Sequence, residues 1–410
     1  MRVKIIFFIF LFLIIAAAGF LLAQEAAHKK AVYELTDEQE IMDGTDSWFI
    51  TASQQATLSA TQIVFLKNGE TAEFLLPPQY FKTSFSNNGR FFAIQTLAPR
   101  ESVEKIDRDL TITVYSDEMR ELYRLNRKVY YDHTFPAVAV SGDDGSVVLG
   151  ESDSGVVWFS DGNGNLLKEV VLFPDVDYDL ERTLEIDLSD DGSQVAVIAS
   201  KRGGSPAGSN APNPDSESHL FLFTREGKEL WRKALPEFNS SEVAISPDGQ
   251  SIVTNSYTIS TDGKLAKRAI IFSQKGNIFC QTDLLFKQAR FSGDSKFLLL
   301  ANNQELQLLD LINGKLRWSQ KISGQTGMMV DLDISEGGEQ VAVLVATNDW
   351  DGRQFIYRLP VVTIYDSQGI EIQKFSFSVE TYGKPILRFT DHDKNLMIGL
   401  GNTLYSYQKK

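Results

Sequence analysis

The chain has 410 residues, which exceeds an ordinary domain and requires either several domains or one large repeat architecture. Its hydrophobic content of 43% excludes a disordered chain, and its formal net charge of −14 argues against nucleic acid as a partner, because acidic surfaces repel phosphates. Cys280 is the single cysteine, so no disulfide forms within one chain and stability must come from a large core.

The first 23 residues have the pattern of an export signal. Arg2 and Lys4 precede an unbroken run of apolar residues and glycine over 5–22, and Ala23 is a candidate cleavage point. We therefore predict a signal peptide over 1–23, which places the mature protein in the periplasm or outside the cell. The apolar run is at the lower length limit for crossing a bilayer, so an uncleaved membrane anchor over 5–22 is the alternative.

A repeated phrase follows this leader. Residues 24–45 are polar and charged, which predicts a linker, and residues 46–410 carry the repeats of one predicted domain. The phrase is an apolar residue, Ser or Thr, a short polar turn and an apolar run, as in ISPDGQSIV from Ile245. Seven copies occur, and their hydroxyl residues are Ser86, Ser141, Ser189, Ser246, Ser292, Ser335 and Thr390.

A second phrase, two apolar strands around a glycine turn, falls between the copies of the first, as in LQLLDLINGKLRWSQKI from Leu306. Each phrase predicts a β-hairpin, because Asp-Gly and similar turns tolerate positive φ. Two hairpins in each period make four antiparallel strands, which is one blade of a β-propeller. The sequence therefore predicts an all-β, seven-bladed β-propeller of four-stranded antiparallel blades.

Closure of the ring needs a strand from the N-terminal part of the chain. The last copy, from Phe389, has room for only three strands. A ring leaves no open edge only if its two ends pair, so we expect strands within 61–76 to complete the last blade. A further strand-like stretch begins near Trp48, and this surplus keeps an eight-bladed ring as the alternative.

The turn ISPDG at 245–249 resembles the FSPDG phrase of WD-repeat-like and TolB-like propellers, and the resemblance covers roughly residues 80–410. Two other stretches resemble the repeats of PQQ-type quinoproteins, through Asp310, Gly314, Lys315 and Trp318 and through Gly227, Lys228 and Trp231. These resemblances imply a propeller in which the tryptophans pack between blades. Quinoprotein dehydrogenases also use a vicinal disulfide, which one cysteine cannot form, so the resemblance argues against quinone-dependent catalysis and allows a non-catalytic relative, such as a scaffold of bacterial outer-membrane assembly.

No catalytic motif stands out in the sequence. The four histidines have no histidine or cysteine companion at metal-ligand spacing, and neither a nucleophile elbow nor a P-loop is present. We therefore expect no catalytic residues, no metal and no cofactor.

The irregular insertions point to one face of the ring. Stereotyped turns join the first strand of each blade to the second and the third to the fourth, whereas the long insertions fall in the other connections, which emerge on the opposite face. The insertions are 97–109, 127–136, 174–182, 201–218 and 348–360. Long loops on a rigid scaffold commonly carry binding, and aromatic and arginine side chains anchor interfaces. The candidate contact residues are Tyr130, Tyr131, His133, Trp350, Arg353 and Tyr357.

These observations predict a non-catalytic propeller that binds or scaffolds proteins in the cell envelope. Its partner would be another envelope protein or an extracellular ligand, and it would contact a membrane only through an uncleaved leader. The alternative is a hydrolase or lyase with its site at the channel mouth on the long-loop face. Polar residues from three or more blades that converge there would favour the enzyme, and an aromatic rim would favour the scaffold.

Overall fold

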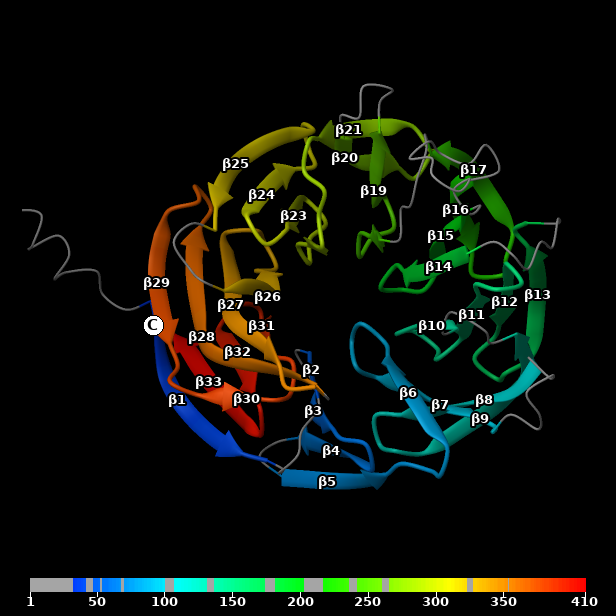
Figure 1. Cartoon of the computed structure of the whole chain (residues 1–410), viewed down its shortest axis with the longest axis horizontal. Helices are drawn as coiled ribbons and strands as arrows, with labels where there is room; N and C mark the ends of the chain where they lie inside the picture. The colour runs from blue at the N-terminus through cyan, green and yellow to red at the C-terminus, as the bar shows by residue number, and fades with distance from the viewer. Residues whose placement is uncertain are drawn as a thin grey trace, which may run out of the picture.

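The chain folds into a closed ring of eight antiparallel sheets in the computed structural model (Figure 1). We number these sheets as blades 1 to 8 in chain order, beginning with the blade that contains β2. The structure describes residues 32–41, 47–51, 54–67, 70–99, 107–130, 136–173, 181–202, 217–235, 242–259, 265–322, 327–352 and 354–410.

Seven blades are continuous in sequence, and each has its first strand at the central channel and its fourth at the outside (Figure 1). Blade 1 comprises β2 (Ser47–Ile50), β3 (Gln55–Leu58), β4 (Gln62–Lys67) and β5 (Glu70–Leu75), and blade 2 comprises β6 (Tyr80–Phe85), β7 (Phe91–Leu97), β8 (Asp107–Ser116) and β9 (Glu121–Tyr130). Blade 3 comprises β10 (Ala137–Val140), β11 (Val147–Glu151), β12 (Val156–Ser160) and β13 (Leu166–Val171), and blade 4 comprises β14 (Glu181–Leu188), β15 (Gln194–Arg202), β16 (Glu217–Thr224) and β17 (Glu229–Leu235). Blade 5 comprises β18 (Val243–Ile245), β19 (Ser251–Ile259), β20 (Leu265–Ser273) and β21 (Ile278–Thr282), and blade 6 comprises β22 (Gln288–Phe291), β23 (Phe297–Ala301), β24 (Glu305–Asp310) and β25 (Lys315–Lys321). Blade 7 comprises β26 (Met328–Ile334), β27 (Gln340–Trp350), β28 (Phe355–Asp366) and β29 (Glu371–Ser376), with the short β30 (Glu380–Thr381) also paired to β28.

Blade 8 joins the two ends of the chain. It comprises β31 (Ile386–Thr390), β32 (Asn395–Leu400), β33 (Thr403–Lys409) and, as its outer strand, β1 (Tyr33–Glu40). Strand β1 pairs antiparallel with β33 from Tyr33 opposite Lys409 to Glu40 opposite Thr403. Such pairing at the seam removes the open edges that an incomplete blade would leave.

The structure corrects three sequence-based expectations. The ring has eight blades rather than seven, so the alternative count is the observed one. Residues 61–76 do not close the ring, because they form β4 and β5 of blade 1. The closing strand instead comes from 33–40, inside the segment expected to be a linker. Blade 1 was missed because its turn after Thr51 reads TASQ, without the aspartate or glycine that every other copy carries.

The seven hydroxyl residues of the repeat are buried, and four of them fasten the turn after the inner strand by the same pair of hydrogen bonds. In blade 5, Ser246 Oγ donates to Asp248 Oδ1 at 2.6 Å and accepts from the backbone N–H of Ser251 at 2.9 Å. The same two bonds recur at Ser86, Ser189 and Ser292. The turn is thus satisfied by local hydrogen bonds, which explains why the phrase is readable in the sequence.

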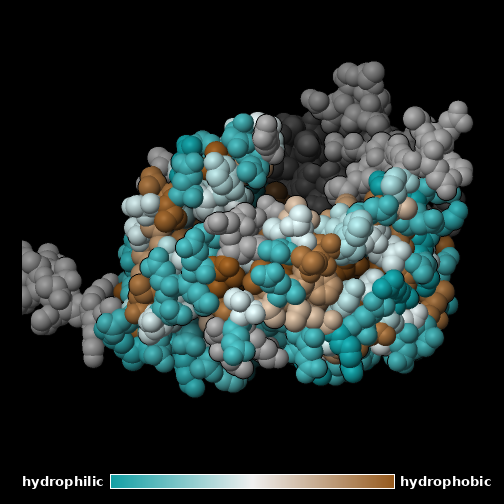
Figure 2. Space-filling model, turned by 90° about the horizontal axis from the view of Figure 1, so that it is seen from below, coloured by the Kyte–Doolittle hydropathy of each residue, from teal (hydrophilic) through white to brown (hydrophobic). Residues whose placement is uncertain are grey.

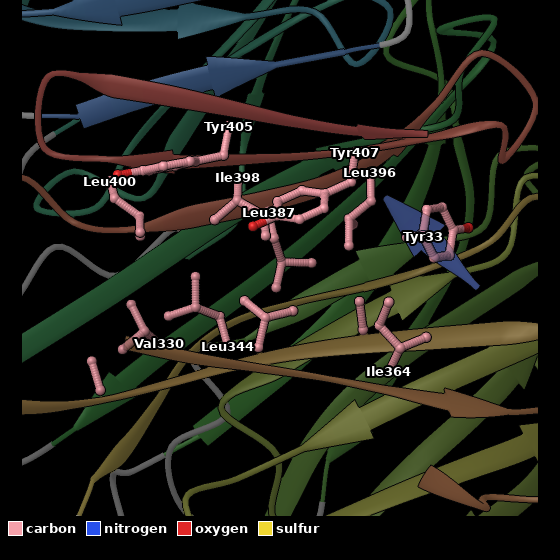
Figure 3. Packing of buried hydrophobic residues seen from close by; sticks show 13 residues of the cluster. Tyr33, Val330, Leu344, Ile364, Leu387, Leu396, Ile398, Leu400, Tyr405 and Tyr407 are labelled. Carbon is pink, nitrogen blue, oxygen red and sulfur yellow. The ribbon is translucent and has the colours of Figure 1, made fainter. Parts of the chain in front are cut away.

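The hydrophobic core is divided among the blade interfaces. Eight clusters of buried residues occur in the described part of the chain, and each lies between two adjacent blades. Figure 3 shows the cluster between blades 7 and 8, where Leu344 and Ile364 lie opposite Leu387 and Leu396. Burial between rather than within sheets makes each blade depend on its neighbours, as in other repeat folds.

Two tryptophans pack between blades as the quinoprotein-like phrase predicts. Trp231 of blade 4 lies against Gly276 in a turn of blade 5, and its Nε1 donates to the Gln274 carbonyl at 2.7 Å. Trp318 of blade 6 lies against Gly369 of blade 7, where an added Cβ would be 2.9 Å from the indole. Glycine is required at these turns because a side chain would displace the ring.

The outer strands combine polar residues with exposed apolar ones, and β13 carries three of the latter, Leu166, Leu167 and Val171. Figure 2 shows one side of the ring, where hydrophobic patches alternate with hydrophilic ones. Exposed apolar residues are ordinary at protein surfaces. Within the described residues, no helix has the length and hydrophobicity to cross a membrane.

Candidate functional site

The described strands that flank the irregular connections end at one face of the ring, which we call the long-loop face. It is the face reached by the links between second and third strands and between successive blades. Tyr130 ends β9 at such a link, whereas Tyr131, His133 and Arg353 lie outside the described residues. Of the predicted contact residues, only Trp350 and Tyr357 can therefore be examined as side chains.

Trp350 lies at the end of an extended hairpin between β27 and β28. These strands pair from Gln340 opposite Asp366 out to Trp350 opposite Phe355. This pairing is longer than that between the second and third strands of the other blades. The rings of Trp350 and Phe355 make an edge-on contact with centroids 5.0 Å apart, and the two residues remain 58% and 49% exposed. Two large aromatic side chains thus form a preorganised apolar tip, and Phe355 was not predicted from the sequence.

Charged contacts brace the stem of this hairpin. Arg358 lies between two carboxylates, with Nη1 2.5 Å from Asp349 and Nε 2.8 Å from Glu380. Strand β30 supplies Glu380 and adds Thr381 opposite Tyr357, so a third strand supports the stem. The Thr381 side chain in turn lies against Gly401 of blade 8, where an added Cβ would be 3.1 Å from its hydroxyl. The hairpin is therefore seated on the neighbouring blade.

Tyr357 supports the hairpin from below and is only half exposed. It packs against the buried cluster between blades 7 and 8, and this burial raises its pKa. The next residues toward the tip alternate, with Ile356 buried and Phe355 exposed. Among the described candidates, Trp350 is the one that presents most of its surface to solvent.

The channel carries a group of charged side chains that the sequence reasoning missed. Each inner strand has a residue two positions before its hydroxyl anchor, and in four blades this residue is charged. The four are Asp187, Arg290, Asp333 and Arg388. The signal was visible as a charge in an otherwise apolar strand, as in Arg290-Phe291-Ser292, which is costly unless the charge has a partner or a use.

Most of the channel carboxylates fasten adjacent inner strands. Asp187 of blade 4 accepts from the backbone N–H of Ile245 in blade 5 at 2.8 Å. Asp331 and Asp333 of blade 7 accept from Leu387 and Phe389 of blade 8 at 3.0 and 2.8 Å. These N–H groups belong to edge strands and would otherwise lack a partner. The bonds give these carboxylates a structural role.

Comparisons with known proteins agree with this architecture. No protein-family model matches the chain, and no curated protein matches its sequence. Solved structures do match, including the Dos1 propeller, with 12% identity, a TM-score of 0.56 and coverage of 92% of this chain and 96% of that one. The C-terminal WD40 domain of Sif2 matches with 11% identity, a TM-score of 0.55 and coverage of 92% and 99%. The chain has a WD-repeat-like propeller fold.

Sequence identities this low establish the propeller fold only. Any function must therefore be argued from the residues of this chain. In the described part of the chain, no three His, Cys, Asp or Glu side chains are grouped to hold a metal ion. Asp161, in a turn that superficially resembles a calcium loop, accepts hydrogen bonds from Asn163 and Asn165 of the same turn. The features that remain for function are the aromatic hairpin and the charged channel.

Proposed function

We propose that the chain is a non-catalytic protein-binding or scaffold propeller outside the cytoplasm, and that it binds its partner on the long-loop face. The observation that carries this proposal is the exposed pair of Trp350 and Phe355 at the end of a braced hairpin. Rigid aromatic side chains bury a large area at a small entropic cost, and they dominate the energetics of many interfaces.

The contacts that hold the hairpin rigid support a binding role for the exposed Trp350 and Phe355 side chains. Arg358, Asp349 and Glu380 hold the stem, and β30 adds backbone pairing at its base. A partner that docks on such a platform pays little to order it, so more of the contact energy appears as affinity. We expect the partner to be another envelope protein or an extracellular ligand that offers an apolar pocket for the two rings.

The proposed location rests on the N-terminal sequence. Its positive residues and the apolar run over 5–22 have the pattern of an export signal, which supports this location. Only nine residues separate Ala23 from Tyr33, the first residue of β1. If the leader remains as an anchor, this segment spans at most about 30 Å, so the ring would lie close to the bilayer surface. Mass measurement of the protein from a membrane and a soluble fraction distinguishes cleavage from anchoring.

A photo-crosslinking experiment tests the binding surface. A photoreactive phenylalanine replaces Phe355 in the full-length protein, and the same residue replaces Ile312, which is 69% exposed on the opposite face, as the matched control. We expect a discrete adduct in the native envelope from position 355 and none from position 312. Trp350→Ala, with the probe at 355, should remove the adduct. Equal adducts from both positions, or none from either, would overturn the proposal.

The charged channel favours the enzyme alternative, a hydrolase or lyase. Glu185 of blade 4 is close enough to Lys82 of blade 2 and Glu242 of blade 5 for their charges to act on its pKa, which burial raises. Polar residues from several blades therefore converge in the channel, although the carboxylates of blades 4 and 7 have structural partners. Hydrolysis of an ester, peptide or glycoside by the purified protein that Glu185→Gln abolishes would favour the enzyme over the scaffold.

A further inference from the structure

A cavity of 410 Å³ occupies the end of the central channel opposite the long-loop face. Its walls come from inner strands and from the turns that follow them, such as Asn87 of blade 2 and Asp190 of blade 4. A cavity of this volume accommodates a small molecule. It lies away from the aromatic hairpin, so an occupant would be distinct from the partner proposed above.

Arg290 lines this cavity and donates no hydrogen bond to the described residues. Its Nε is buried and has no partner, and its guanidinium makes no hydrogen bond or ion pair with the described residues. The positive charge of Arg388, on blade 8, and burial lower the pKa of Arg290, although the nearby carboxylates of Asp331, Asp333 and Asp187 act in the opposite direction. A buried guanidinium without an acceptor is costly, and an oxyanion would supply paired acceptors.

Arg388 and Asp187 have hydrogen-bond partners, whereas Asp190 and Asp333 each have one oxygen without a donor among the described residues; Asp190 accepts from Asn87 through Oδ1. Arg388 is paired with Asp331 at 2.6 Å, and both oxygens of Asp187 accept backbone N–H groups, from Leu188 and Ile245. Asp333 accepts from Phe389 through Oδ2 only, which leaves Oδ1 without a hydrogen-bond donor among the described residues. Arg290 and Asp333 occupy equivalent positions on adjacent blades, and no ion pair joins them.

We propose that this cavity binds a small zwitterion, an α-amino acid with an apolar side chain. The carboxylate of the ligand accepts hydrogen bonds from Arg290, and its ammonium group donates to Oδ1 of Asp333. A zwitterion is preferred over a simple anion because Asp187, Asp190 and Asp333 outnumber the two arginines of the cavity. An added net negative charge would meet repulsion there, whereas a zwitterion leaves the local charge unchanged.

The remaining wall of the cavity suits an apolar side chain. Phe49, Ile245, Phe291 and Ile386 contribute to the lining, and they come from blades 1, 5, 6 and 8. These apolar surfaces lie beside the polar side chains of the same cavity, and small-molecule sites combine the two kinds of surface in this way.

Calorimetric titration of the full-length protein with three related compounds tests the proposal. L-Phenylalanine carries both charges, L-phenylalaninamide lacks the carboxylate, and 3-phenylpropionate lacks the ammonium group. We expect binding of phenylalanine, and binding at least about 10-fold weaker for each of the other two, because each loses a charge-assisted contact. An affinity for 3-phenylpropionate equal to that for L-phenylalanine would overturn the proposal that the ligand is a zwitterion. Absence of heat with phenylalanine and with leucine would mean that water alone satisfies Arg290.

Variants locate the binding in the channel. Arg290→Gln should weaken phenylalanine binding by about 10-fold or more, and Asp333→Asn should do so while its amide oxygen still accepts from Phe389. Arg124→Gln, at an exposed site on β9, is the matched control and should bind as the unaltered protein does. Thermal unfolding without ligand checks folding, and we expect Arg290→Gln to unfold no earlier than the unaltered protein. Unchanged binding in a folded Arg290→Gln protein would overturn the assignment.

Discussion

The hydroxyl of Tyr33 donates a hydrogen bond of 2.7 Å to Oε1 of Gln340, a residue 307 positions later in the chain. Gln373 makes two hydrogen bonds with the backbone of Tyr33. Its Oε1 accepts from Tyr33 N at 2.7 Å and its Nε2 donates to Tyr33 O at 2.7 Å. Figure 3 shows the Tyr33 ring beside the cluster between blades 7 and 8. The closing strand is therefore held by blade 7 as well as by its own blade.

The first prediction concerns this seam. Tyr33→Phe removes a buried donor and leaves Gln340 without it, so the free energy of unfolding should fall by about 1–2 kcal/mol. Tyr33→Ala also opens a cavity in the core and should cost about 3–5 kcal/mol. Asp37→Ala, at an exposed position of the same strand, should stay within about 0.5 kcal/mol. Urea unfolding measures all three, and a Tyr33→Ala protein as stable as Asp37→Ala would show that the seam contributes little.

The seam also marks the limit of what the sequence can predict about the fold. Blades were predictable because their turns rest on local bonds, such as those of Ser246, which leave a repeated phrase. Strand β1 has no such phrase. Only Tyr33 at its start is fully buried, and most of the strand is exposed and polar. Its strand state comes from pairing with β33, which local hydropathy does not encode.

The candidate site was likewise predictable from the sequence only in part. An insertion with Trp350 was visible in the sequence, and its place on the long-loop face followed from the order of the hairpins. Pairing of β30 with β28 was not visible, since Glu380 and Thr381 form a strand only through contact with Arg358 and Tyr357. The channel charges were visible as residues, but their convergence depends on the geometry of the whole ring.

A second prediction concerns the turns between first and second strands. Gly192 has φ +63°, and an added Cβ would lie 2.7 Å from Cβ of Ser141 in blade 3. Gly192→Ala should therefore lower the free energy of unfolding by about 2–4 kcal/mol through strain and overpacking. The equivalent turn of blade 6 has Ser295 at φ +60°. Ser295→Gly should change stability by less than about 1 kcal/mol, because relief of strain offsets the greater freedom of the unfolded chain. Equal effects of the two substitutions in thermal unfolding would contradict this account.

A third prediction is a dependence of stability on pH through Glu151. This side chain is buried at the end of β11. Burial, opposed by the Ser154 hydroxyl and assisted by the charges of Asp153 and Asp107, raises its pKa to about 7. Because the pKa is higher in the folded state, the contribution to stability is present below about pH 4.5 and is lost as pH rises through 7. The unaltered protein should lose up to about 3 kcal/mol of unfolding free energy over this range through this group.

Glu151→Gln isolates this contribution. The amide can still accept from Ser154 but does not ionise, so the difference in stability between variant and unaltered protein should grow in favour of the variant from pH 5 to pH 8. Urea unfolding at pH 5, 6.5 and 8 measures it. Asp187 and Asp333, whose pKa values burial raises to about 6, titrate in both proteins and cancel in the difference. A difference that is constant with pH would show that Glu151 is ionised throughout.

The last prediction contrasts two arginine–aspartate pairs of blade 7. Asp331 is buried, and it accepts from both Arg388 at 2.6 Å and the Leu387 N–H at 3.0 Å. Asp349 is 60% exposed and contacts only the Arg358 head group, at 2.5 Å. Asp331→Ala leaves a guanidinium and an N–H without their acceptor inside the ring, so it should cost about 3–5 kcal/mol. Asp349→Ala should cost under about 1 kcal/mol, since solvent screens the pair. Adding Arg388→Met to Asp331→Ala should recover part of the loss, because the unpaired charge is then gone, and a double variant as unstable as the sum of the single variants would show that the two side chains act independently.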